Sequence, residues 1–248
     1  MRLFSIAIAT AALLASTATA KVTEKMAESY PLNADGTISL SNINGSVEIV
    51  GWDRNEVDFE AEKSARNEDA LKHIRIEVRH TPERLVIKTE HEKTWKLWNS
   101  SNAQVAYKLK VPAGATLKKI DVVNASIRVS GVRGPIDLES VNGSIKALGM
   151  TAGGSFETVN GSITATFASL SAGDKVSLET VNGSCTLLLP ADTAFDLDAD
   201  TVNGRISCDF PVTIRKSGRG ALKGSVNGGG AKVSLESVNG SLNVKQIE

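Results

Sequence analysis

The feature that most constrains this chain is a five-residue motif, Val-Asn-Gly-Ser-Ile, which recurs with little change along the sequence. Successive asparagines from Asn124 to Asn203 are 18, 18, 22 and 21 residues apart, and the last copy follows after 36. Apolar residues alternate with polar ones on both sides of each copy, which indicates two short strands per repeat. Such self-similarity is typical of solenoids, in which each repeat packs against its neighbours. The central residues of the seven copies are Asn44, Asn124, Asn142, Asn160, Asn182, Asn203 and Asn239.

Two arrangements of the repeat compete: hairpins that turn at Asn-Gly, and coils whose strands stack on those of the next repeat. A hairpin at Asn142-Gly143 would pair Val141 with Ser144, which mixes apolar and polar side chains on one face. A bend that joins two sheets of a coil has no such conflict. We therefore predict an all-β, single-stranded β-solenoid with coils of about 18–22 residues, stacked about 4.8 Å apart. The 36-residue step is interpreted as two coils of 18.

The asparagine and glycine of the motif are predicted to be structural. A corner requires one residue near left-handed backbone geometry, which Asn tolerates and Gly adopts freely. Asparagine side chains stacked one coil apart can also form a ladder of amide hydrogen bonds. A row of asparagines that binds carbohydrate or metal is the functional alternative. Ala125 replaces the glycine in one copy, so we expect that corner to differ slightly.

The N-terminal residues have the features of a secretory signal peptide. A basic start and an apolar run precede Ala18-Thr19-Ala20, which matches the small-x-small pattern at cleavage sites. No later apolar stretch is long enough to span a bilayer, so no transmembrane segment is expected. We expect an exported protein, periplasmic or extracellular, whose mature chain begins at Lys21.

The sequence divides into a signal peptide over residues 1–20, an N-terminal β-rich region over residues 21–117 and β-solenoid repeats over residues 118–248. The second region includes the first repeat copy. Residues 50–117 lack the motif and form either further coils or a separate β subdomain that caps the solenoid. Alternating residues predict strands in this part at residues 56–62, 74–78, 85–89 and 106–111, with helical turns at 67–73.

Charge and motif content narrow the function. The chain has 28 basic and 28 acidic residues and no basic run, which argues against nucleic acid or anionic membrane as the main partner. No Gly-x-Ser-x-Gly elbow or phosphate-binding loop occurs, so neither catalysis nor a cofactor is expected. His73, His80 and His91 lack the spacing of a zinc site, and no metal site is predicted.

An acidic residue stands three positions before the asparagine in six copies. Stacking would place these carboxylates in one column about 5 Å apart, where neighbouring charges repel by about 1 kcal/mol even in water. The column either lies in solvent with splayed side chains or binds a cation or a cationic ligand. Its members are Asp121, Glu139, Glu157, Glu179, Asp200 and Glu236.

The cysteines and tryptophans leave alternatives open. Cys185 and Cys208 fall at inward positions of neighbouring coils, with Cα atoms roughly 8 Å apart in perfect register. That exceeds the roughly 7 Å limit for a disulfide, but a small register shift would allow one. A disulfide and two buried thiols therefore both remain as alternatives.

Trp95 and Trp98 form either an exposed aromatic contact for a sugar or partner, or part of the packing of the β-rich region.

Three parts of the sequence carry a family resemblance: the Val-Asn-Gly-Ser-Ile copies, the segment from Ile43 to Trp52, and Val111-Pro112-Ala113-Gly114. Together they resemble the bacterial putative-adhesin family of β-strand-repeat domains of unknown function, which is related to the head GIN domain family. The resemblance covers roughly residues 36–248 and implies a cell-envelope or secreted β-solenoid. Our hypothesis is an exported, non-enzymatic scaffold that binds a surface polymer or envelope protein. The alternatives are a polysaccharide-active β-helix enzyme and an envelope-stress protein with a periplasmic partner.

Overall fold

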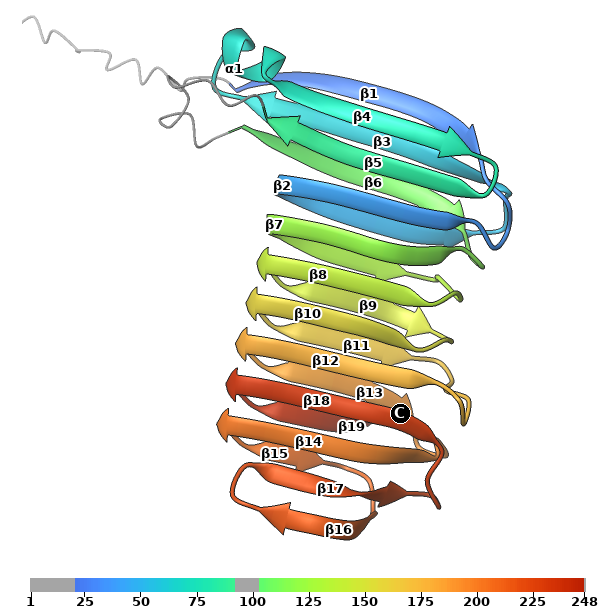
Figure 1. Ribbon diagram of the computed structural model, residues 1–248, viewed down its shortest axis with the longest axis vertical. Coiled ribbons are helices and arrows are strands. Elements are labelled where there is room, and N and C mark those ends of the chain that lie inside the picture. Colours follow the sequence, from blue (N-terminus) through green and yellow to red (C-terminus); the bar gives the residue numbers. More distant parts are fainter. Residues whose placement is uncertain (1–20, 92–102, 248) are drawn as a thin grey trace, which may run out of the picture.

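The structure is a computed structural model that describes residues 21–91 and 103–247. The expected signal peptide and both Trp95 and Trp98 lie outside the described residues. Figure 1 shows a flattened solenoid in which two layers of strands stack along one long axis. No helix in the described part of the chain is long and apolar enough to cross a membrane.

The central coils each contribute one strand to either layer, joined at the Asn-Gly corner. In one layer, β8 pairs in parallel with β10, and β10 with β12, so that the motif asparagines are register partners. In the other layer, β9, β11 and β13 pair in parallel in the same way. The β-solenoid is therefore confirmed, and antiparallel hairpins at Asn-Gly do not form. The strands of these coils are β7 (Thr116–Ser130), β8 (Ile136–Asn142), β9 (Ile145–Met150), β10 (Gly154–Asn160), β11 (Ile163–Phe167), β12 (Lys175–Asn182) and β13 (Cys185–Pro190).

The last coil of the sequence is inserted inside the stack. Strand β18 (Ala231–Asn239) pairs with β12 on one side and with β14 (Phe195–Asn203) on the other. Strand β19 (Leu242–Ile247) likewise lies between β13 and the short β15 (Ile206–Cys208). The coils therefore follow one another in space in an order that differs from their order in the chain, as Figure 1 shows.

The interpretation of the 36-residue step as two coils is wrong. Strands β16 (Val212–Gly218) and β17 (Ala221–Val226) form an antiparallel hairpin, and β17 pairs antiparallel with β14. The segment after β17 is a turn, in which Asn227 and Gly228 have positive φ angles of 50° and 88°. The hairpin covers the edge of β14, and the chain then returns across it to enter the stack as β18.

The N-terminal region combines parallel strands next to the repeats with antiparallel strands beyond them. Strand β2 is parallel to β7 on one side and to β5 and β6 on the other. Beyond it, β3 and β1 add antiparallel strands next to β6, and β4 adds one next to β5. The predicted strands and helical turn are present as β3 (Glu56–Ala65), α1 (Glu68–Lys72), β4 (Ile74–Thr81), β5 (Arg84–His91) and β6 (Gln104–Pro112). The region also contains β2 (Thr37–Trp52), which carries the first motif copy, and β1 (Val22–Pro31), which was not predicted.

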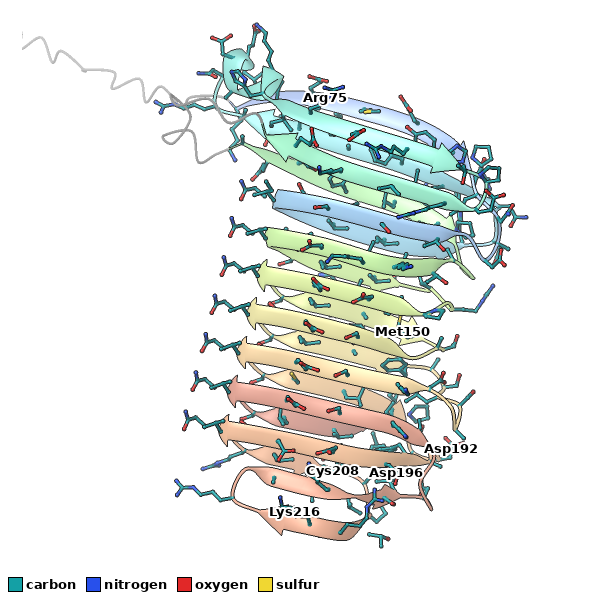
Figure 2. All side chains as sticks on the ribbon, in the orientation of Figure 1. Arg75, Met150, Asp192, Asp196, Cys208 and Lys216 are labelled. Atoms are coloured by element: carbon teal, nitrogen blue, oxygen red, sulfur yellow. The ribbon has the colours of Figure 1, made fainter. Side chains whose placement is uncertain are left out.

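Charged strands stand at both ends of the molecule. Figure 2 places Arg75 on β4 at one end and Lys216 on β16 at the other. Among the described strands, β4 pairs only with β5 and β16 pairs only with β17. Exposed strand edges invite pairing with other chains, and charged side chains on them oppose it. The solenoid therefore ends in strands that discourage uncontrolled stacking.

The core is a set of rows that run along the axis between the two layers. Residues four before the motif asparagine, such as Leu138 and Phe156, are fully buried. Residues three and five after it, such as Ile163 and Ala165, are buried as well. Because identical positions stack in register, each row is filled by similar aliphatic or aromatic side chains along its length. This arrangement explains how a chain with few aromatic residues builds a continuous core.

The motif glycine has a different role from the one expected. Of the glycines that follow a motif asparagine, only Gly45 has a positive φ, at 133°, and none of the seven motif asparagines does. The predicted left-handed corner is therefore wrong for the other copies. A Cβ atom at Gly161 would lie 2.2 Å from the carbonyl oxygen of Gly143, and one at Gly183 would lie 1.9 Å from that of Gly161. At these two corners glycine is required because the adjacent coil approaches too closely for a side chain.

We predict that Gly161→Ala destabilises the protein by about 1–3 kcal/mol, since the added methyl group meets backbone that cannot move aside freely. Chemical denaturation of the purified chain measures this difference. The matched control is Gly173→Ala, because a Cβ atom at Gly173 meets nothing within 4 Å. Equal stability of the two variants would contradict the close-approach explanation.

Candidate functional site

The candidate site lies on the outer face of one layer, formed by the first half of β7 and by β8, β10, β12, β18 and β14. Along each of these strands, side chains alternate between the core and the outer face. In β8, Leu138 and Ser140 point inward and are buried, whereas Glu139 and Val141 point outward. The residues three before and one before each asparagine therefore form two parallel rows on the same surface.

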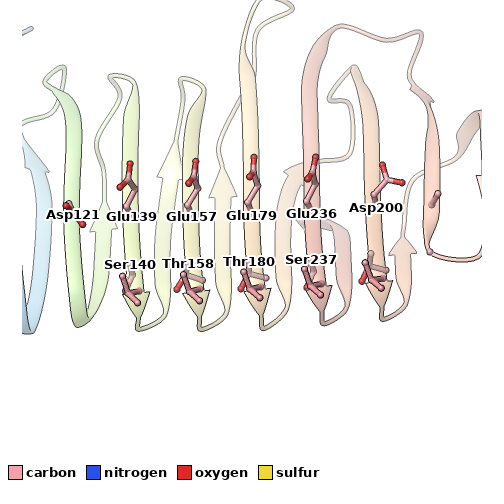
Figure 3. Close-up of a pocket in the computed structure, with 18 of the residues that line it drawn as sticks. Asp121, Glu139, Ser140, Glu157, Thr158, Glu179, Thr180, Asp200, Glu236 and Ser237 are labelled. Atoms are coloured by element: carbon pink, nitrogen blue, oxygen red, sulfur yellow. The ribbon is translucent and has the colours of Figure 1, made fainter.

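The first row consists of the six acidic residues singled out in the sequence, and the structure brings all of them together. Glu139 is the register partner of Glu157, which is in turn the partner of Glu179. The inserted coil places Glu236 between Glu179 and Asp200. Figure 3 shows the carboxylates side by side in this row. In spatial order, the acidic row is Asp121, Glu139, Glu157, Glu179, Glu236 and Asp200.

The second row consists of exposed valines, which the sequence analysis did not identify as surface residues. Their exposed fractions run from 36% at Val123 to 73% at Val202. The sequence does contain a signal for this exposure. The residue four before each asparagine points inward, so alternation along the strand makes the residue one before the asparagine point outward. The valine row is Val123, Val141, Val159, Val181, Val238 and Val202.

The two rows form the walls of a groove with a volume of about 680 Å³. Serine and threonine side chains between the rows form its floor, as Figure 3 shows. The hydroxyls of Thr158 and Thr180 each donate a 3.0 Å hydrogen bond to a glycine carbonyl of the adjacent coil, at Gly143 and Gly161. These donors are used within the fold, so the floor is a structural element that fixes the spacing of the walls.

The acidic row is compensated by cations only towards its ends. Lys119 lies 3.8 Å from Glu139, and Lys223 lies 3.0 Å from Asp200. Within the part of the chain that the structure describes, the central members Glu157, Glu179 and Glu236 form no ion pair. The pKa of Glu157 is raised, first by partial burial and then by repulsion from Glu179, Glu139 and Asp137. The groove therefore carries its least compensated negative charge in the middle.

The motif asparagines form one ladder beside the valine row. The side-chain Nδ2 of Asn160 donates to Oδ1 of Asn142 at 2.8 Å, and that of Asn203 donates to Asn239 at 3.0 Å. The other links have similar lengths, and the ladder follows the spatial order of the coils, including the insertion. Because each amide is used by its neighbour, the ladder acts as a structural element at the rim of the groove. Its members are Asn44, Asn124, Asn142, Asn160, Asn182, Asn239 and Asn203.

The two cysteines do not form a disulfide: both Cys185 and Cys208 are free thiols. The expectation that they lie on neighbouring coils is wrong, because β19 separates β13 from β15. Two strand spacings and an offset of two residues along the strand put their Cα atoms about 12 Å apart, beyond the reach of a bridge. Burial raises the pKa of Cys185 to about 12, so this thiol stays protonated and unreactive.

Other candidate residues do not converge on a site. Among the described residues, no group of three or more His, Cys, Asp and Glu side chains is placed to hold a metal ion. His80 contacts the carbonyl oxygen of Pro31. Trp95 and Trp98, the possible aromatic contact, lie outside the described residues.

We predict that Glu157→Gln raises the melting temperature near pH 7, because it removes a charge that the fold disfavours. A carboxyl group whose pKa is raised in the folded state costs stability when ionised, and this cost disappears as the pH falls below the ordinary glutamate range. The stabilisation should therefore vanish near pH 3, where both forms are neutral. Thermal unfolding across this pH range measures it. Glu83→Gln, at an exposed turn, serves as the control, and equal effects of the two variants at all pH values would contradict the raised pKa of Glu157.

The repeat region matches a known family model, and the chain as a whole is similar to several solved structures. The family model Toastrack DUF4097 matches residues 127–245. Among solved structures, the chain is similar to a putative cell adhesion protein from Clostridium sporogenes, with 14% identity, a TM-score of 0.44, and coverage of 92% of this chain and 100% of that one. A putative adhesin from Bacteroides fragilis has 12% identity and a TM-score of 0.36, with 90% and 97% covered. A putative lipid binding protein from Parabacteroides distasonis has 10% identity and a TM-score of 0.33, with 92% and 97% covered.

No curated protein sequence matches the chain significantly. The family match covers most of the coils that carry the repeated motif and extends through the inserted C-terminal coil. It confirms the resemblance to β-strand-repeat domains of unknown function that the motif copies suggested. Residues 127–245 thus match the family model Toastrack DUF4097, a family of unknown function.

Proposed function

We propose that this protein is an exported, non-enzymatic scaffold of the bacterial cell envelope or surface, and that it binds a surface polymer or protein along its groove. The observation that carries the proposal is the continuous groove between the acidic row and the valine row. The groove runs across six coils, so five strand spacings give it a length of about 24 Å. Solenoids commonly use such extended surfaces for binding.

The exposed valines support a binding role more strongly than a purely structural one. Side chains such as Val159 and Val181 are 41% and 40% exposed although their row is continuous along the axis. Continuous apolar patches are uncommon on monomeric proteins and often mark sites of interaction. The adjoining acidic row adds charge that would select among partners.

A polysaccharide-cleaving enzyme is the second candidate, and one observation favours it. Retaining glycosidases use two carboxyl groups about 5–5.5 Å apart, one of them with a raised pKa. Glu157 has a raised pKa and adjoins Glu139 and Glu179 in neighbouring strands. The scaffold is the better proposal because the acids form one uniform row, whereas catalysis requires two carboxyl groups in distinct environments.

Binding of the mature chain to a glycan array and to bacterial envelope extracts tests the proposal. We expect a bound partner that is lost in the variant Val159→Thr/Val181→Thr, which keeps side-chain shape but removes apolar surface. Ile214→Thr is the control, because Ile214 is also exposed, at 58%, but lies on β16 outside the groove.

The same samples are assayed for release of reducing ends from polysaccharides. Turnover that depends on Glu157 would favour the enzyme instead. Binding that is equally strong in the groove variant and in the wild-type chain would refute the groove as the binding surface.

A further inference from the structure

We infer that the occupant of the groove is an extended protein segment in which Lys or Arg residues alternate with apolar residues. This inference rests on the proposed function and names the partner chemistry of the same groove. It follows from three properties of the groove. The valine wall is apolar, the acidic wall carries unpaired charge, and both walls run along the solenoid axis.

The valine row defines an apolar wall that the described part of the chain leaves uncovered. Val141, Val159, Val181 and Val238 have exposed fractions between 38% and 41%, so the wall is uniform over the central coils. Burying this surface under a partner would remove apolar area from water, which favours binding. A purely ionic occupant, such as a polyamine, would leave this wall in water.

The acidic row defines the charge of the occupant. The central carboxylates Glu157, Glu179 and Glu236 lack ion-pair partners among the described residues, while Lys119 and Lys223 pair with acids nearer the ends. A neutral occupant would cover these carboxylates without pairing them, and covering an unpaired charge is costly. Partial burial and, after it, repulsion from the neighbouring acids raise the pKa of Glu157, and a cationic occupant would relieve that repulsion. Charge complementarity therefore selects a basic segment.

The direction of the rows selects an extended chain. Both rows run across the strands, along the solenoid axis, and each coil places its valine two residues from its acid, about 7 Å apart. In an extended chain, successive side chains point to opposite sides. A segment lying along the groove would thus direct alternate side chains to the acidic wall and to the valine wall. At about 3.4 Å per residue, roughly seven residues fill the 24 Å length.

The test uses a synthetic peptide of alternating Lys and Val, long enough to span the groove, with binding measured by fluorescence polarisation. A peptide of equal composition with the Lys and Val residues in separate blocks, a Glu–Val peptide and spermine are the comparison ligands. We expect the alternating Lys–Val peptide to bind most tightly. Its affinity should fall as salt is raised, because the exposed charge pairs are screened.

Two groove variants separate the contributions of the walls. Glu157→Gln/Glu179→Gln should weaken binding of the Lys–Val peptide roughly tenfold and flatten its salt dependence, since it removes two exposed ion pairs with the peptide. Val159→Thr/Val181→Thr should weaken binding at every salt concentration. Glu83→Gln/Ile214→Thr, which makes the same kinds of change outside the groove, should leave the affinity unchanged. Thermal unfolding of each variant verifies that the fold is retained.

The outcomes distinguish the inference from the proposed function. Equal binding by spermine, by the block peptide or by the groove variants overturns the inference. If a glycan binds in a groove-dependent manner while the Lys–Val peptide does not bind, the inference fails and the proposed function stands. If no ligand depends on the groove, both fail.

Discussion

The structure depends on one constraint: adjacent coils hydrogen-bond as parallel strands in register, so that each residue lies next to its counterpart in the neighbouring coil. In-register pairing about 4.8 Å apart turns every repeated position of the sequence into a row. Leucines at one position become a core row, asparagines become a ladder, and acids become a charged wall. The surface properties of the protein are therefore direct consequences of its backbone pairing.

In-register stacking also brings backbone atoms and like charges close together, and particular residues of the sequence relieve part of this strain and repulsion. Close approach of adjacent corners excludes a side chain at Gly161, and the hydroxyls of Thr158 and Thr180 satisfy the glycine carbonyls below the groove. Like charges are forced together at Glu157, and among the described residues lysines pair with the acidic row only towards its ends. The uncompensated centre is the feature that a purely structural role does not explain, and it is the basis for assigning a cationic occupant.

The repeated motif was sufficient to predict the solenoid, the inward rows and the column of six acids, because periodicity encodes register. It could not predict the order of the coils. Residues 175–184 and 232–241 differ only at Thr180 and Ser237, so nothing local distinguishes a coil that follows its neighbour from one inserted beside it. That insertion separates Cys185 from Cys208 and places Glu236 next to Asp200. The valine row was predictable from alternation, whereas the glycine requirement depends on a tertiary approach that spacing does not reveal.

Disulfide mapping of the coil order tests the central claim most directly, with cysteine pairs introduced at positions 177, 198 and 234 in a chain carrying Cys185→Ala and Cys208→Ser. Register places Ser234 beside both Ser177 and Asp198. The pairs Ser177→Cys/Ser234→Cys and Ser234→Cys/Asp198→Cys should therefore cross-link on oxidation, since their Cα atoms lie about 4.8 Å apart. The pair Ser177→Cys/Asp198→Cys, about 10 Å apart, should remain reduced. Efficient cross-linking of that third pair, without the first, would show that the coils stack in chain order and would contradict the account.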